Sequence, residues 1–168
     1  MAKTFNGGIK AGTTAFDAES KHLDDSCKIA RDTLAEAFEG VTMMKQLPRE
    51  DKIDLIGTTG IGFAPDGGYW MKDGKMIAAF EAKKQQNHGN AIERFYKNAT
   101  IAKTANPDII YVSFFTGQGA AEGGILHNHS IMASKLFGPN FRFYCKPEGF
   151  SYEEIESIMT ATINEAMQ

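Results

Sequence analysis

Apolar residues recur along the chain with two different spacings, which predicts an alternation of helices and strands. From Leu23 to Phe38 they fall three and four residues apart, as on one buried helical face, and Gly40 follows where a helix stop is expected. This pattern predicts a helix over 16–38. Strands are predicted at the short apolar runs 75–83, 109–115 and 141–145. Further helices are predicted over 90–103, over 126–136 and onward from Ser151, a favourable N-cap residue.

The Asp73-Gly74 pair lies between two extended runs and favours a tight β-hairpin, whose first strand is expected to begin at Asp66. Residues 47–51 are expected to form a loop or a short helix start, and 58–63 an irregular stretch or weak strand. The predicted order is helix, hairpin, helix, strand, helix, strand, helix. It indicates an α/β fold with a central mixed sheet flanked by helices. A length of 168 residues fits one domain, with 1–13 as a flexible arm.

Composition narrows the class of protein. The apolar content of 42% is ordinary for a globular domain. The longest apolar run, 109–115, is too short to cross a bilayer, and the first residues lack the apolar segment of a secretory signal. We therefore expect a cytoplasmic protein with no membrane partner. Cys27 and Cys145 are then expected to be free thiols, not a disulfide or a zinc site.

Charge is distributed unevenly along the chain. The net charge of −3 argues mildly against nucleic-acid binding, because phosphate contacts need Lys and Arg. The segment 72–103, however, carries seven Lys and Arg residues against three Asp and Glu residues. Such a local excess is what a surface that follows a phosphate backbone needs.

Asp66, Glu81 and Lys83 are the candidate catalytic residues. Residues i and i+2 of a strand share a face, so Glu81 and Lys83 are expected to point together and Ala82 away from them. In a hairpin that turns at 73–74, Asp66 returns opposite the pair. Two carboxylates and an amine at one point suit metal-assisted phosphodiester hydrolysis. The alternative is a solvated hairpin with an ordinary surface Glu and Lys.

Three blocks in this order resemble the EcoRI and MunI family of restriction endonucleases, of the PD-(D/E)XK kind. They are Pro65-Asp66, Glu81-Ala82-Lys83, and the run from Gly89 to Arg94 followed by Lys97-Asn98. The resemblance implies a restriction-endonuclease-like core and a Mg²⁺ ion, with Mn²⁺ as an alternative. It also implies a homodimer on double-stranded DNA, cutting a palindrome with an AATT core. No nucleotide cofactor is expected, because the Gly-rich run 117–124 lacks a P-loop ending.

The resemblance also assigns roles to individual residues. Asp66, Glu81 and Ala82 form the metal set, and Lys83 positions or activates the water. The DNA-binding residues are Gly89, Asn90, Ala91, Glu93 and Arg94, with Lys97. Lys84, next to Lys83, is a further candidate for a contact with the phosphate backbone, and the alternative is that it is simply solvated. In this assignment the amide of Asn90 and the guanidinium of Arg94 read purine edges, and Ala91 contacts a thymine methyl. The alternative for this segment is an ordinary helix start, with Asn90 as the cap and Glu93 completing a capping box.

Other functions stay open at this point. A phage or mobile-element nicking or homing enzyme could use the same core, and a silent DNA-binding domain is a third hypothesis. The loop 116–124 either contacts the outer bases or is a flexible connection. Glu39, at the end of the first predicted helix, is a weaker candidate for an additional carboxylate, because a Glu at a helix end is usually solvated.

Overall fold

The computed structural model describes residues 15–84 and 91–168, and the side chains within 22–84 and 92–168. The predicted arm 1–13 lies outside the described residues. Gly89 and Asn90, two of the predicted DNA-binding residues, also lie outside them. No helix in the described part of the chain is both long and apolar enough to cross a membrane.

A five-stranded mixed sheet forms the centre of the molecule, in the order β1-β2-β3-β4-β5. Its strands are β1 (Thr42–Met44), β2 (Tyr69–Lys72), β3 (Lys75–Lys84), β4 (Ile110–Thr116) and β5 (Phe141–Cys145). The first three pair antiparallel, while β3, β4 and β5 pair parallel. Parallel neighbours need a crossover, and a helix supplies it each time. The predicted α/β class with a central mixed sheet is confirmed.

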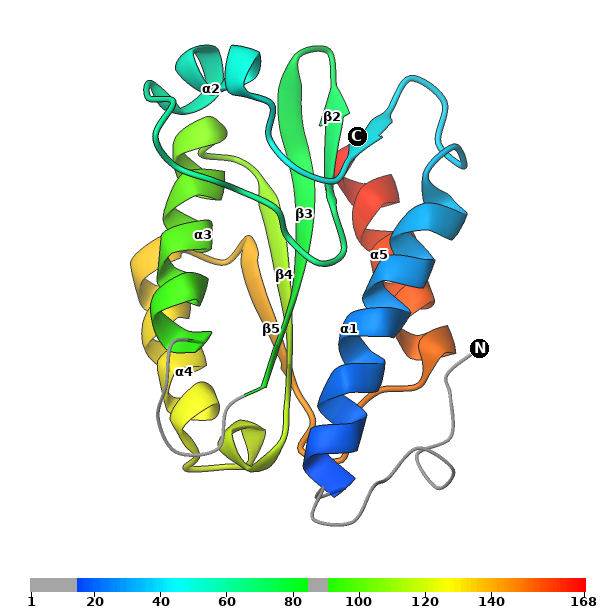
Figure 1. The fold of residues 1–168 in the computed structure, drawn as a ribbon, viewed down its shortest axis with the longest axis vertical. Helices are drawn as coiled ribbons and strands as arrows, with labels where there is room; N and C mark the ends of the chain where they lie inside the picture. The colour runs from blue at the N-terminus through cyan, green and yellow to red at the C-terminus, as the bar shows by residue number, and fades with distance from the viewer. Residues whose placement is uncertain (1–14, 85–90) are drawn as a thin grey trace.

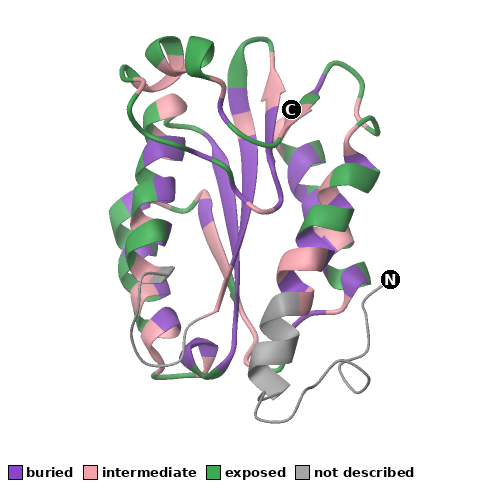
Figure 2. Cartoon of the chain, in the orientation of Figure 1, coloured by how far each residue is buried: buried purple, intermediate pink, exposed green. Residues whose placement is uncertain are grey.

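Helices cover both faces of the sheet (Figure 1). They are α1 (Ala15–Leu34), α2 (Arg49–Ile56), α3 (Ala91–Ala105), α4 (Ile125–Phe137) and α5 (Tyr152–Ala166). Helices α1 and α5 pack on one face and α3 and α4 on the other, so buried residues fill two separate cores (Figure 2). The two cysteines are free, as expected, and Cys27 is part of the core under α1.

The hairpin between β2 and β3 closes at the predicted residues. Asp73 and Gly74 both have positive φ, 52° and 77°. Two consecutive residues of this kind form the turn whose twist matches the strands, and Asp-Gly tolerates it best. The paired strands are unequal, because β2 has four residues and β3 has ten. The last regular pair is Tyr69 with Ala79, so the end of β3 has no strand beside it on the β2 side.

Several boundaries differ from the predictions. The first strand of the hairpin begins at Tyr69, three residues after Asp66, which lies in a turn. Helix α1 ends at Leu34, and turns replace its predicted last residues. Strand β1 was not predicted, and α2 begins within 47–51, where a loop or a short helix start was expected. Strand β1 has only three residues and α2 buries none, so neither carries a readable apolar period.

Candidate functional site

Glu81 and Lys83 project from the open end of β3 on the side of α3, as their spacing predicts. The Glu81 side chain is 2% exposed, and that of Lys83 is 13% exposed. Lys83 Nζ lies 3.9 Å from Glu81 Oε1. This distance permits an ion pair but exceeds that of a charge-assisted hydrogen bond, about 2.8 Å. The ammonium is therefore not fully engaged by Glu81.

Asp66 reaches the same point from the turn before β2. Its backbone N–H donates to Glu81 Oε1 at 3.4 Å. Its Oδ2 accepts from the backbone N–H of Ala82 at 3.3 Å. The structure thus brings Asp66, Glu81 and Lys83 together, as the sequence predicts, although Asp66 lies in a turn and not in a strand.

The backbone of Ala82 faces this cluster while its side chain does not. The methyl group packs in the core beneath α1 and α5. Two residues earlier, both backbone groups of Phe80 bond to Gly67 and Gly68 on the β2 side. Strand geometry repeats every second residue, so the carbonyl of Ala82 points to the same side, toward Asp66. Ala82 can therefore contribute a backbone oxygen.

The close approach of the Asp66 turn to β3 depends on Gly67. Its N–H donates to Phe80 O at 2.9 Å. A Cβ at this position would lie 2.5 Å from Phe80 Cβ, closer than such atoms approach. Any side chain at residue 67 would push the turn away from β3, and Asp66 with it.

Two neutral side chains hold the far oxygen of Glu81. Asn98, on α3, donates from Nδ2 to Glu81 Oε2 at 2.6 Å. Tyr111, on β4, donates its hydroxyl to the same oxygen at 3.1 Å. No role was predicted for either residue, although Asn98 belongs to the third block of the resemblance. Both come from elements distant in sequence, and only the folded sheet brings them to Glu81.

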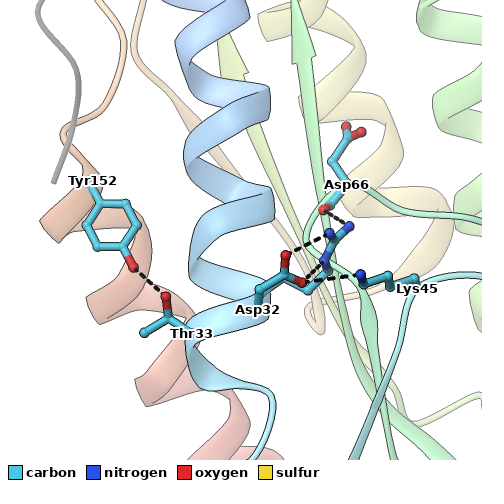
Figure 3. A network of polar contacts seen from close by, with 6 residues as sticks. Asp32, Thr33, Lys45, Asp66 and Tyr152 are labelled. Carbon is cyan, nitrogen blue, oxygen red and sulfur yellow. Dashed lines mark hydrogen bonds and ion pairs between the residues drawn. The ribbon is translucent and has the colours of Figure 1, made fainter.

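Arg31 attaches α1 to the Asp66 turn (Figure 3). Its Nη1 donates to the backbone oxygen of Asp66 at 3.4 Å, and its Nε pairs with Asp32 at 2.9 Å. Lys45, just after β1, lies 3.8 Å from the same Asp32 carboxylate. Figure 3 shows the Asp66 carboxylate pointing away from this network, which leaves it available to the cluster around Glu81.

Asp24 adds a third carboxyl group near the site. Burial raises its pKa to about 7, and the charge of Asp66 adds to this, while Lys28 and Lys83 oppose it. Asp24 and Arg31 are seven residues apart, and this spacing places them on the same face of α1. The sequence alone could have indicated that they lie on one face. Glu39, the additional carboxylate considered from the sequence, is exposed and does not line the cleft at the site.

The electrostatics of Glu81 are set by its burial. Burial raises the pKa of its carboxyl group to about 7, Lys83 lowers it, and Asp66 raises it further. The Asn98 amide and the Asp66 N–H also favour the charged form. A bound cation would act in the same direction as Lys83, because it stabilises the carboxylate over the acid.

The donor set fits a hard divalent cation. Asp66 and Glu81 offer carboxylate oxygens, and Ala82 offers a carbonyl oxygen. Within 15–84 and 91–168 no cluster of three or more His, Cys, Asp or Glu side chains is placed to hold a metal ion. Mg²⁺ commonly binds through one or two carboxylates and keeps several waters, so this smaller set matches its preference.

A cleft of about 380 Å³ opens above the cluster. Its floor is Asp66, Glu81 and Lys83, and α3 supplies Arg94, Lys97 and Asn98. The opposite wall comes from α2 and the segments on either side of it, and it includes Gln46, Lys52 and Phe63. Cationic side chains thus surround an acidic floor. Lys52 was not predicted as a site residue, because α2 buries none of its residues and so has no apolar period that would orient its side chains.

Some of the remaining predicted DNA-binding residues line the cleft, and others do not. Arg94 and Lys97 line the cleft with the catalytic candidates. Ala91 is the first residue of α3, and Glu93 is exposed on that helix and does not line the cleft. Lys84 ends β3, and its side chain packs close to Gly117 at the start of the Gly-rich loop.

Comparisons with known proteins add no assignment. No model of a protein family, no curated protein and no solved structure matches the chain. The function has to be argued from the site itself.

Proposed function

We propose that this protein is a Mg²⁺-dependent endonuclease that hydrolyses phosphodiester bonds in double-stranded DNA. The observation that carries the proposal is the convergence of Asp66, Glu81 and Lys83 at the open end of β3, beneath a cleft with cationic walls. The mixed sheet flanked by helices agrees with the core that the resemblance implies.

The residues divide the chemistry between them. Asp66, Glu81 and the Ala82 carbonyl would hold the cation, which when bound supplies a Lewis acid and an acidified water. Lys83, incompletely paired with Glu81, is placed to stabilise the negative charge that builds on the phosphate, or to orient the water. Lys52, Arg94 and Lys97 would hold phosphates of the DNA strand in the cleft.

The finer specificity rests on the resemblance. We propose a homodimer that cuts a palindrome with an AATT core, since two-fold symmetry of the protein would match that of the DNA site. Arg94 lines the cleft from α3, and in this proposal its guanidinium would contact a base edge beside the cut. Sedimentation of the protein with and without a duplex would measure the oligomeric state.

Digestion of a long duplex DNA with Mg²⁺ tests the proposal directly. The controls are the same reaction with EDTA and with Glu81→Ala protein, and the cut ends are sequenced. Discrete fragments whose ends share an AATT core support the full proposal. Metal-dependent cutting at random sites retains the hydrolase and removes the sequence specificity. Cuts in one strand alone favour the nicking-enzyme alternative.

Absence of metal-dependent cutting would contradict the proposal. Binding of duplex DNA without cutting would then favour the third hypothesis, a silent DNA-binding domain. That domain would still need the cationic wall, so Lys52→Ala and Lys97→Ala would reduce its affinity at low salt.

A further inference from the structure

We infer that Asn98 and Tyr111 are positioning residues that fix the Glu81 carboxylate in its metal-binding orientation. This inference rests on the proposed function and deepens it. It assigns different roles to the two oxygens of Glu81: Oε2 is held by the protein, and Oε1 is turned toward Asp66, Lys83 and the cleft.

The contacts around the two oxygens are unequal. Oε2 accepts two hydrogen bonds, at 2.6 Å from Asn98 and 3.1 Å from Tyr111. The contacts of Oε1 with the described residues are longer, at 3.4 Å to the Asp66 N–H and 3.9 Å to Lys83 Nζ. Hydrogen bonds to a carboxylate are strongest when short, so the two on Oε2 determine how the group is rotated.

The donors are themselves held rigidly. Asn98 is 8% exposed, and its neighbours Phe95 and Ala99 anchor that stretch of α3 in the core. Tyr111 is fully buried, and its ring stacks on Phe141 with centroids 5.2 Å apart. Tyr111 cannot leave Glu81 without opening this core, and Asn98 is held at Glu81 by the packing of its helix. The orientation of the carboxylate is therefore set before any ligand arrives.

The chemistry of the donors suits this role. An amide and a phenol hold a carboxylate without adding a positive charge, so the charge of Glu81 stays available to a cation. Burial and the neighbouring Glu81 raise the pKa of the Tyr111 hydroxyl, which keeps it a donor. If both donors were lost, Glu81 could rotate and close its 3.9 Å gap to Lys83. That rotation would occupy the ammonium and turn Oε1 away from the cation.

The test compares Tyr111→Phe and Asn98→Leu with wild-type protein and with Asn106→Ala. Asn106 directly follows α3, and its side-chain amide donates to the Met76 carbonyl of β3 at 2.9 Å. It is the matched control because this hydrogen bond also joins the α3 region to β3 but lies at the other end of the strand from Glu81. The Mg²⁺ concentration for half-maximal single-turnover cleavage is measured, with duplex affinity in EDTA as the second readout. Mn²⁺ binding in the absence of DNA is followed by electron paramagnetic resonance.

We expect the Tyr111→Phe and Asn98→Leu proteins to bind Mn²⁺ and Mg²⁺ about 10- to 100-fold more weakly than the wild-type protein. Loss of other groups that orient a metal ligand has an effect of this size. Duplex affinity in EDTA should not change. Asn106→Ala should lower thermal stability and leave the metal dependence unchanged. Tyr111→Phe removes one oxygen only and keeps the ring stack, so it provides a folded variant even if Asn98→Leu does not fold.

Wild-type metal dependence in a folded Tyr111→Phe protein, with wild-type Mn²⁺ affinity, would overturn the inference and leave the proposed function intact. If wild-type protein does not cut DNA, the proposed function fails, and the Mn²⁺ titrations alone decide the inference. Absence of Mn²⁺ binding to the wild-type protein overturns the inference, and the cleavage assay alone then decides the proposed function.

Discussion

The two ends of the β2–β3 hairpin are built in different ways. At the closed end, Asp73 and Gly74 form the turn through their own backbone preferences. At the open end, Glu81 is surrounded by residues from a preceding turn, from α3 and from β4. The closed end is a local structure, whereas the open end exists only when the whole sheet has formed.

The difference matters because the open end carries the proposed chemistry. A local turn needs few contacts and tolerates change elsewhere in the molecule. The cluster at Glu81 buries charge and polar groups, which is costly unless each group has a partner. Mutations at the two ends should therefore have different consequences for activity and for stability.

The largest expected effect follows from Lys83→Ala. Loss of a group that stabilises transition-state charge typically costs about 10²- to 10³-fold in rate. We expect that loss in single-turnover cleavage, with affinity for the duplex nearly unchanged. Lys75→Ala, at the closed end of the same strand, is the matched control and should cut at the wild-type rate. Equal loss of cutting and of binding in Lys83→Ala would reduce Lys83 to a phosphate contact.

This contrast also separates what the sequence could and could not predict. The Asp73-Gly74 turn and the Ser151 cap of α5 depend on a few adjacent residues, and both are confirmed. The same is true of Glu81 and Lys83 sharing a face. The convergence of Asp66 was predicted from hairpin geometry, but the boundary of its strand was wrong by three residues.

The partners of Glu81 could not be predicted in the same way. Tyr111 follows it by 30 positions, and only the parallel pairing of β3 and β4 brings the two together. Asp24 precedes it on α1 and reads as an ordinary polar residue beside the apolar stripe. Lys52 lies on a helix without an apolar period. None of these positions carries a local signal, because each is defined by tertiary packing.

Arg94→Ala distinguishes base reading from phosphate binding at the open end. If Arg94 reads a base, affinity for the preferred site should fall by about 1–3 kcal/mol, with a smaller loss on random duplex. Lys97→Ala, one turn further along α3 on the same cleft, is expected to weaken both equally and to reduce the salt dependence. Competition binding at two salt concentrations measures these differences. Equal losses in Arg94→Ala would make it a second phosphate contact.

Two glycine-to-alanine substitutions, one at each end of the hairpin, compare the two ends directly. At Gly74, φ is 77° and nothing lies within 4 Å of an added Cβ. Gly74→Ala should therefore cost about 1–2 kcal/mol of unfolding free energy through backbone strain alone, with cleavage unaffected. At Gly67 the added Cβ meets Phe80 at 2.5 Å, so Gly67→Ala should cost a similar amount through overpacking and also impair cleavage.

Denaturant unfolding and single-turnover rates measure the two effects separately. Gly60→Ala is the control, because it has an open position and no positive φ. A Gly67→Ala protein with the wild-type cleavage rate would show that the Asp66 turn need not approach β3 so closely.

The smallest expected effect is on the pH dependence of stability. Burial raises the pKa of Asp24 to about 7 from 3.8, so the folded protein keeps a proton that the unfolded chain releases near pH 4. The protonated Asp24 carboxyl therefore makes its full contribution to the free energy of unfolding below pH 4, and this contribution is lost as the pH rises through 7. For one group, the free energy of unfolding changes between these two pH values by at most about 1.4 kcal/mol per pH unit. Asp24→Asn should remove that slope from thermal unfolding between pH 5 and 8 in EDTA.

Asp32→Asn provides the contrast for this measurement. Its hydrogen bond with Arg31 lowers the pKa of Asp32, so the carboxylate is already ionised in both states above pH 5. The substitution should leave the slope between pH 5 and 8 unchanged. An unchanged slope in Asp24→Asn as well would assign the proton to Glu81 alone, because the pKa of Glu81 is raised into the same range. Glu81→Gln would then remove the slope.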